Sequence, residues 1–410
     1  MNNHGIYSQP TKSLNLGKRN KTYHFEWAPM TKLTNIENRY GRFARDIIVG
    51  HPELTHKSQA WSDIWKKMAE NHMFGLCLPN AYGGQGGNLN GLAGAARALA
   101  SAGCHIGIAM SWLIHEIIGC RLIHAFGGDH QKKELLPDLA SGKITVCLAV
   151  SEPDIGAHPK YLRTKAYFEN GTWTLNGQKT YITNGPISEW FIVMAKTDVL
   201  DGKNRYTAFL VYKDTPGIHI HDPMDLPFLK SSPHGGISLA DCQIAEEQIL
   251  GPKDHAYAAM AVPFRSVEDV LLMSLVSGGC NFELDWLGQA VGQYKGLLEN
   301  NHILLKLGHL KCQADAMNAL ADKAAEIFVE NEKDMRLSTL PNFMRNQAES
   351  FQQQFKELTT DLPVAENPAE LPVTRDIDGL LSIGRQAGKN RMIKAGGKYF
   401  QGPISGRRST

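Results

Sequence analysis

The spacing of apolar residues divides the chain into two helical blocks with a block of strands between them. From about residue 31 to 142, apolar side chains recur at helical spacing, as in the set Trp61, Trp65, Met68 and Ala69. From about 144 to 254 the apolar runs become short and rich in β-branched and aromatic residues. From about 256 onward the helical period returns. The order helix, strand, helix predicts an α+β architecture.

Turn signals separate the expected strands of the middle block. Asn170-Gly171, Asn176-Gly177, Asn184-Gly185 and Pro216-Gly217 each follow or precede an apolar run. The expected strands are 145–150, 172–175, 190–195, 208–212 and 218–221. Short strands at this spacing predict a β-barrel or sandwich rather than a βαβ sheet.

Domain boundaries follow from these changes of period. We expect an N-terminal extension at 1–30, a helical domain at 31–143, a β domain at 144–254 and a C-terminal helical bundle at 255–410. The glycine-dense segment 78–87 is expected to be a loop, and the proline-bearing segment 361–373 is not expected to be helical.

Composition narrows the class of protein without naming a function. Of 410 residues, 42% are hydrophobic and 20% charged, as in a globular protein, and the net charge of +2 gives no reason to expect a nucleic-acid or membrane-surface partner. We find no stretch of about eighteen apolar residues that would span a membrane. The first thirty residues lack the apolar run of a signal peptide, so we expect a cytoplasmic protein, with a mitochondrial presequence as the alternative.

Familiar metal and phosphate motifs are missing. The seven cysteines include no CxxC pair, and His115-Glu116 lacks the second histidine of a HExxH zinc site, so we expect reduced thiols and no metal. The third glycine of a GxGxxG motif near Gly84 would fall on Leu89, and no GxxxxGK[ST] occurs. A nucleotide cofactor would therefore be bound without a Rossmann fold.

Several motifs in the first two blocks resemble the acyl-CoA dehydrogenase family. The motifs are Ala149-Val150-Ser151-Glu152-Pro153-Asp154-Ile155-Gly156, Leu162-Arg163-Thr164-Lys165-Ala166, Asn176-Gly177-Gln178-Lys179-Thr180-Tyr181-Ile182-Thr183-Asn184-Gly185, Gly75 to Gly84, and Phe126 to Lys143. The resemblance covers roughly residues 35 to 280, and a weaker resemblance extends to about residue 393. It implies the family's three-domain fold, with FAD between the β domain and the C-terminal helices.

The same resemblance assigns flavin contacts to four positions. Val150 and Ser151 match positions whose backbone and hydroxyl meet the flavin ring. Tyr181 matches an aromatic position beside the ring, usually tryptophan, and Thr183 matches a threonine that hydrogen-bonds near the reactive ring nitrogen. From propensity alone, Tyr181 and Thr183 would simply be strand residues.

The family's reaction needs a carboxylate base, and the resemblance offers one candidate. The proton next to a thioester carbonyl is weakly acidic, so a positioned base must remove it. The usual late glutamate is absent, because Gly384 or Arg385 falls at that slot. Glu268, ten residues before Gly278, matches the earlier position used by isovaleryl-CoA-dehydrogenase-like members.

Glu268 could instead have a structural role, and two other acids remain open as the base. Ser266 and Asp269 after Pro263 resemble a capping box, which would make Glu268 a first-turn acid that favours the helix dipole. Asp269 and Asp378 are more distant candidates for the base itself.

Two departures from the family pattern concern the substrate entrance. Ala157-His158 replaces the usual Ser-Asp pair near the acyl-CoA entrance, where His158 is expected to be a loop residue rather than a ligand. The segment Lys230 to Gly236 offers hydroxyls and amides for a phosphate, but its composition favours a surface turn.

Two further departures concern the FAD tail. The arginine-phenylalanine-glycine element for the pyrophosphate is replaced by a stretch around Tyr294 to Leu298 with only Lys295 as a cation. The glutamine and Gly-Gly pair for the adenosine end appears as Lys356-Glu357-Leu358-Thr359-Thr360. Threonine does not allow the close backbone approach of glycine.

The resemblance implies a FAD-dependent oxidoreductase of fatty acid metabolism that introduces a double bond into an acyl thioester. The thioester is carried by CoA or by an acyl-carrier protein, and a small electron-transfer flavoprotein is the expected oxidant. A homotetramer or homodimer is the expected assembly. The alternatives are an oxygen-using flavoenzyme of the same fold and a non-catalytic relative that acts as a binding or assembly partner.

Overall fold

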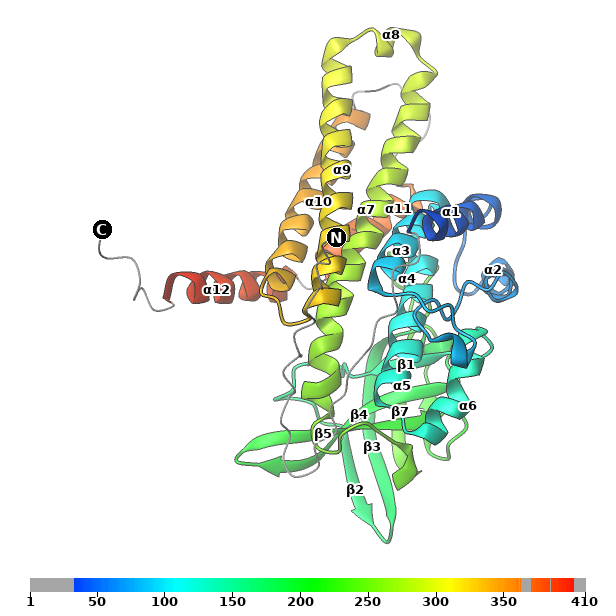
Figure 1. Cartoon of the computed structure of the whole chain (residues 1–410), viewed down its shortest axis with the longest axis vertical. Helices are drawn as coiled ribbons and strands as arrows, with labels where there is room; N and C mark the ends of the chain where they lie inside the picture. Colours follow the sequence, from blue (N-terminus) through cyan, green and yellow to red (C-terminus); the bar gives the residue numbers. More distant parts are fainter. Residues whose placement is uncertain (1–32, 361, 363–369, 384, 402–410) are drawn as a thin grey trace, which may run out of the picture.

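The computed structural model describes residues 33–360, 362, 370–383 and 385–401. The elements follow the predicted order of helices, sheet and helices, which confirms the α+β fold class (Figure 1). The predicted N-terminal extension 1–30, most of 361–369 and Gly384 lie outside the described residues.

The first block is helical up to Ala140. Its elements are α1 (Leu33–Phe43), η1 (Ala44–Ile48), α2 (Gln59–Glu70), η2 (Asn80–Tyr82), α3 (Leu89–Gly103), α4 (Ile106–Ile114), η3 (His115–Cys120), α5 (Arg121–Phe126) and α6 (Asp129–Ala140). Local sequence sets two helix starts, because the side chains of Ser58 and Asn88 accept hydrogen bonds from the amides of Trp61 and Gly91.

A continuous helical rod runs through the centre of this block. It comprises α4, the π-turn η3 and α5, and spans Ile106–Phe126. This rod is long and apolar enough to cross a membrane, although its most apolar window is entirely buried inside the protein. The sequence expectation of no such stretch is therefore wrong, because His115, Glu116 and Arg121 interrupt the apolar run and disguise its length. Its burial is that of a core helix.

The middle block is one connected mixed sheet of eight strands in the described part of the chain. The strands are β1 (Val146–Ala149), β2 (Lys165–Glu169), β3 (Thr172–Thr183), β4 (Trp190–Leu200), β5 (Lys203–Tyr212), β6 (Ile218–Ile220), β7 (His234–Ala245) and β8 (Ile249–Leu250), with short 3-10 turns η4 (Gly185–Ile187) and η5 (Glu246–Gln248). Their order is β6-β7-β3-β2-β4-β5-β8, and β1 pairs with β4 in parallel. Every other pair except β2 with β4 is antiparallel.

Strand β4 joins the sheet to the helices because both of its faces are buried. Phe191 and Val193 lie in the core shared by the strands, whereas Ile192 and Met194 pack into the core of the helical blocks. The alternation of side chains along a strand places neighbouring residues in the two cores. A strand covered on both faces therefore fixes the sheet against the helices.

Several strands differ from the sequence expectation: β2, β7 and β8 were not expected, and β3 is longer than expected. β3 continues past the expected end at residue 175 to Thr183, because Asn176-Gly177 lies within the strand, where the β3–β7 register shifts, and not in a turn. Gly177 has φ of 152°, and a Cβ there would lie 2.5 Å from the Thr164 hydroxyl. Strand β7 was not expected, because its first residues are buried on both faces and show no alternation.

In the segment Lys230 to Gly236, Lys230 is exposed but residues 231–236 are buried, so the segment is not the surface turn that was expected. Ser231 and Ser232 are 1% and 2% exposed, and His234 is buried as well. The Ser231 hydroxyl accepts a hydrogen bond from the Ile108 amide, and the indole of Trp61 donates to the Ser231 carbonyl. The helices that cover this loop come from a distant part of the sequence, so composition did not reveal them.

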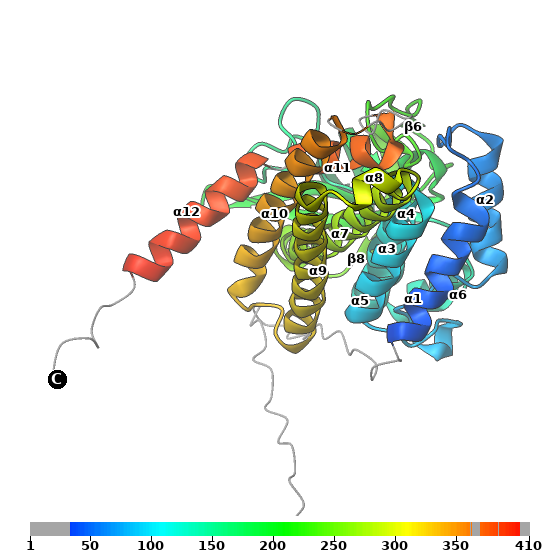
Figure 2. The ribbon, with the colours of Figure 1, turned by 90° about the horizontal axis from the view of Figure 1, so that it is seen from above.

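The last block contains a long helical hairpin. Its elements are η6 (Tyr257–Ala261), α7 (Val262–Gly292), α8 (Lys295–Leu298), α9 (Asn301–Glu330), α10 (Arg336–Thr360), α11 (Pro372–Ser382) and α12 (Arg385–Gln401). Helix α8 lies at the tip of the α7–α9 hairpin, at the opposite end from the sheet (Figure 1). Helix α12 lies beside α10 and points away from the body (Figure 2). Pro372 begins α11, so the end of 361–373 is helical, as proline is tolerated in a first turn.

Candidate active site

A cavity of about 170 Å³ lies where the sheet, the central rod and the start of α7 meet. One wall is polar and comes from the ends of β1 and β3. Apolar side chains also line it, among them Ile114 and Ile118 of the rod and Phe264 of α7. The cavity therefore brings together segments from all three blocks of the chain.

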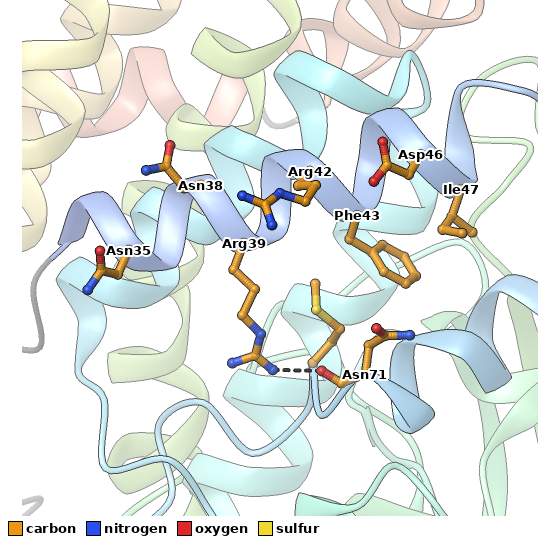
Figure 3. Close-up of a pocket in the computed structure, with 9 residues that line it drawn as sticks. Asn35, Asn38, Arg39, Arg42, Phe43, Asp46, Ile47 and Asn71 are labelled. Carbon is orange, nitrogen blue, oxygen red and sulfur yellow. Dashed lines mark hydrogen bonds between the residues drawn. The ribbon is translucent and has the colours of Figure 1, made fainter.

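A second, larger cavity of about 540 Å³ lies on the outside of α1 and η1. Figure 3 shows that its lining is mostly polar, with Arg39 reaching across to donate a hydrogen bond to the Asn71 carbonyl. None of the residues predicted from the sequence lines it. We therefore assign the chemistry to the smaller cavity, which is lined by six of them: Val150, Ser151, Ala157, Tyr181, Thr183 and Glu268.

Val150 and Ser151 line the cavity directly after β1. The Thr180 amide donates to the Ser151 carbonyl over 2.9 Å, which ties this segment to β3. Beneath them, the buried ammonium of Lys179 donates to the Val150 carbonyl and to the Glu152 carboxylate, over 3.0 Å and 2.9 Å. The backbone of the cavity wall is thus held from behind by an ion pair.

Tyr181 lines the same wall in an unusual conformation. Its φ is +54°, and its side chain is 61% exposed. Positive φ is uncommon for an aromatic residue, and here it coincides with a break in the β3–β7 register between Lys179 and Ile182. This irregularity directs an exposed ring to the cavity, where a planar ligand could stack on it.

Thr183 lines the cavity at the end of β3 and bonds to a histidine behind it. Its hydroxyl oxygen lies 3.1 Å from Nε2 of His234. The Nδ1 atom of His234 lies 3.0 Å from the Ser232 carbonyl, which can only accept, so Nδ1 carries the proton. Burial lowers the pKa of His234 and keeps its imidazole neutral. Sequence reasoning missed this partner, because it treated residues 230–236 as a turn.

Glu268 of α7 lines the cavity together with the strand residues. The helix is already formed before Ser266, since η6 leads into α7 through Ala261 in helical conformation. Ser266 is therefore not an N-cap, and the capping-box alternative for Glu268 is wrong. The carboxylate lies well inside a helix, in a partly buried position.

The alternative acids do not line this cavity. Asp269 follows Glu268 on α7 but is not among the lining residues. Asp378 lies on α11 and forms an ion pair with Lys356, with 2.5 Å between Nζ and Oδ2. Arg385, at the late slot, pairs with Glu349 over 3.1 Å.

Two cavity residues near Glu268 were not predicted. Arg265 is the one cation among the lining residues and precedes Glu268 by one turn of α7. Tyr257 of η6 donates its hydroxyl proton to the Ala157 carbonyl over 2.8 Å, which holds the 157 loop against the start of α7. Helical spacing from Glu268 was the signal that could have revealed Arg265.

The predicted substrate residues Ala157 and His158 separate in the structure. Ala157 lines the cavity, whereas His158 does not. The His158 side chain is exposed, its Nδ1 accepts from the Lys160 amide, and its ring lies 4.8 Å from that of Tyr161. The structure therefore places His158 in a loop beside the cavity.

The segments expected to hold the FAD tail lie away from the cavity in this chain. The stretch Tyr294 to Leu298 forms α8 at the far tip of the hairpin (Figure 1). Residues 356–360 form the last turn of α10, and the Thr359 hydroxyl donates within that helix, to the Phe355 carbonyl over 2.9 Å. The cavity suits a flavin ring. In a single chain, neither of these two segments lies where it could bind the FAD pyrophosphate.

Within the rod, His115, Glu116 and Cys120 of η3 form a buried group whose candidate ligand atoms lie within 4.8 Å of one another. Glu116 accepts a hydrogen bond from the Cys77 amide, and His115 Nε2 lies 3.0 Å from the Leu139 carbonyl. Burial raises the pKa of Glu116 to about 7 and lowers that of His115 to about 4. These groups have protein partners and lie off the cavity. All seven cysteines are free, and only Cys312 is exposed.

Comparison with known proteins identifies the two matched regions. Residues 34–143 match the family model "Acyl-CoA dehydrogenase, N-terminal domain", and residues 147–242 match "Acyl-CoA dehydrogenase, middle domain". Together they cover about half of the 410 residues. This match includes the β1 and β3 wall of the cavity and ends before α7.

Individual relatives are similar over different lengths. An acyl-CoA dehydrogenase of Bacillus subtilis is 28% identical over 70% of this chain and 76% of its own length. The mitochondrial isovaleryl-CoA dehydrogenase of Arabidopsis thaliana is 29% identical over 60% of this chain and 59% of its own. The matched region spans only 50–59% of the next curated relatives.

The fold has close counterparts among solved structures. A glutaryl-CoA dehydrogenase from Mycobacterium smegmatis, solved in complex with FADH2, superposes with a TM-score of 0.78 at 20% identity. The superposition covers 92% of this chain and 97% of that one. The C-terminal helices therefore keep the overall arrangement of such a protein, although their sequence has diverged.

Proposed function

Because the chain belongs to the acyl-CoA dehydrogenase family, a family of FAD-dependent oxidoreductases acting on CH–CH groups, we propose that it dehydrogenates an acyl thioester with Glu268 as the base. The observation that supports this most is the cavity itself. Glu268 of α7 lines it together with Val150, Ser151, Tyr181 and Thr183 of the β domain. A carboxylate and a flavin-ring wall that line the same cavity are what this reaction requires.

The β-domain wall suits the ring of FAD. Ser151 and Thr183 offer hydroxyls at the edge of the cavity, and Tyr181 offers an exposed aromatic face. When bound, FAD supplies the acceptor for the hydride that leaves the β-carbon. The residues of this chain position that ring and keep water from it.

Glu268 removes the proton from the α-carbon of the thioester. The electron pair of the broken Cα–H bond forms the Cα=Cβ bond as the β-hydrogen departs with its electrons. Ile114, Ile118 and Phe264 add apolar surface to the cavity in which the carboxylate acts. The product is the α,β-unsaturated thioester.

The remaining features of the proposal follow the family. The thioester is carried by CoA or by an acyl-carrier protein, in a pathway of fatty acid metabolism, and an electron-transfer flavoprotein removes the electrons. The enzyme is a cytoplasmic homodimer or homotetramer. An assembly is consistent with the position of α8, because a second copy is needed if α8 is to approach a bound FAD tail.

The visible spectrum of the purified protein with added FAD tests the proposal. We expect a protein-bound flavin spectrum that bleaches anaerobically with one member of a panel of acyl-CoAs and acyl-carrier proteins. Glu268→Gln should keep the flavin spectrum and slow bleaching by 10² to 10⁴-fold, because a general base contributes about that much. Asp269→Asn is the matched control on the same helix and should bleach like the wild type.

Other outcomes discriminate among the functions. Bleaching at the wild-type rate in Glu268→Gln would place the base elsewhere. Rapid oxygen consumption by the reduced protein would favour an oxygen-using flavoenzyme. A protein that ignores added FAD would refute the enzyme proposal and favour a non-catalytic relative, consistent with its divergent α8 and α10 segments.

A further inference from the structure

We propose that His234 is a positioning residue that holds the hydroxyl proton of Thr183, so that Thr183 presents only a hydrogen-bond acceptor to the flavin and favours its reduced form. The inference rests on the proposed function, which places a flavin ring against Thr183. It concerns a histidine that has no assigned role and that does not line the cavity itself.

The hydrogen-bond chain behind Thr183 has a defined direction. The Ser232 carbonyl, 3.0 Å from Nδ1 of His234, can only accept, so the Nδ1 proton is committed to it. A neutral imidazole then has a lone pair on Nε2, which lies 3.1 Å from the Thr183 hydroxyl. Thr183 must donate to that lone pair. Its own lone pairs remain for the cavity.

The surrounding structure holds this chain in place. Thr183 and His234 are direct partners across the β3–β7 ladder. The Ser232 hydroxyl lies 3.2 Å from that of Ser111 on the central rod, and the Asn184 amide donates to the Pro233 carbonyl over 2.7 Å. With His234 only 6% exposed, water does not compete for its ring nitrogens. The direction of the Thr183 hydroxyl is therefore preorganised.

A fixed acceptor distinguishes the two oxidation states of a flavin. The oxidised ring presents nitrogen lone pairs at its reactive edge, whereas reduction by two electrons adds a proton there and creates an N–H donor. A hydroxyl that can rotate serves both forms, by donating to one and accepting from the other. A hydroxyl whose proton is donated to His234 can only accept a hydrogen bond, so it can bond to the N–H of the reduced form alone. The expected consequence is a more positive potential, which favours removal of hydride from a saturated thioester.

Spectroelectrochemical titration of the flavin-loaded protein tests this inference. His234→Asn keeps a donor for the Ser232 carbonyl but is too short to reach Thr183, so it frees the hydroxyl. We expect the ratio of reduced-flavin to oxidised-flavin affinity to fall about tenfold, a shift of about 30 mV to more negative potential for a two-electron couple. His234→Gln, whose side chain reaches farther, should restore much of the wild-type potential.

A double-mutant cycle and a matched histidine make the test specific. In a Thr183→Val background, His234→Asn should cause no further shift, because its effect requires the hydroxyl. His221 forms a similar bond to the Ser238 hydroxyl, 2.7 Å away and outside the cavity, so His221→Asn should leave the potential unchanged. If His234→Asn does not fold, His234→Phe carries the same expectation.

Two results would overturn the inference and leave the proposed function intact. One is a wild-type potential in folded His234→Asn and His234→Phe. The other is an equal shift with Thr183→Val already in place. Failure of the wild-type protein to bind flavin would instead refute the proposed function, and with it the premise of this inference.

Discussion

The buried pair of Lys179 and Glu152 shows how single residues hold the cavity wall. Lys179 is fully buried, and burial lowers its pKa to about 8 against the attraction of Glu152. Burial acts to raise the pKa of Glu152, but the charge of Lys179 and hydrogen bonds from Thr164 and Arg163 hold it below its usual value. The ammonium also holds the carbonyl of Val150, which lines the cavity.

Lys179→Met should destabilise the protein by about 3–5 kcal/mol, because it leaves a buried carboxylate without its cation. Urea denaturation checks this value. The double variant Glu152→Gln/Lys179→Met should lose clearly less than the sum of the two single changes, since neither charge then remains unpaired. Additive losses would mean that the pair is not energetically coupled.

Among the elements, the contact of α3 with α7 depends on one glycine. A Cβ on Gly278 of α7 would lie 2.4 Å from the Arg97 carbonyl and 2.9 Å from Cβ of Ala100, both on α3. Gly288 of the same helix has no heavy atom within 4 Å of such a Cβ. A glycine-to-alanine change therefore tests close packing at Gly278 and intrinsic helix propensity at Gly288, within one helix.

Gly278→Ala should destabilise the protein by about 1–3 kcal/mol, because the backbones of α3 and α7 must move apart. Gly288→Ala should instead stabilise by about 0.5–1 kcal/mol through helix propensity. Thermal or urea unfolding of the two variants provides the comparison. Equal effects would show that the helices relax around the added methyl group. Because α7 carries Glu268, slower bleaching in Gly278→Ala alone is also expected.

For the whole molecule, a buried carboxyl group links three helices of the C-terminal block. Glu283 of α7 accepts hydrogen bonds from Gln352 of α10 and from Thr374 of α11, the latter over 2.6 Å. Burial raises the pKa of Glu283 to about 8 despite these donors. The neutral form is therefore the one that suits the folded protein.

This group predicts a pH dependence of the global stability. The folded pKa lies above the unfolded value of 4.5, so the stabilising contribution is full below pH 4.5 and is lost as the pH rises through about 8. Its size is on the order of a few kcal/mol. Urea midpoints measured from pH 5 to 9 should fall less steeply in Glu283→Gln, whose side chain is always neutral. An unchanged slope would assign the pH dependence to other groups.

Local signals in the sequence determined the order of the blocks, most helices and the motif-bearing strands. Helical spacing and caps act within a few residues, so α2 could be predicted without knowledge of its partners. Strand β7 and the buried loop at Ser231 and Ser232 could not, because other segments cover both of their sides. The Asn176-Gly177 turn signal was misleading, because the pair lies inside β3, opposite a bulge of β7 between Leu239 and Cys242.

The residues of the candidate site were predicted from the sequence individually, without knowledge of how they lie relative to one another. Val150, Ser151, Tyr181 and Thr183 were predicted from motifs, and Glu268 from its spacing to Gly278. Only the tertiary structure decided that all five line one cavity, that α7 is already helical before Ser266, and that His234 lies behind Thr183. The physical reason is the separation along the chain over which the interactions act. Periodicity and capping depend on neighbouring residues, whereas a cavity is formed by burial and pairing between segments about a hundred residues apart.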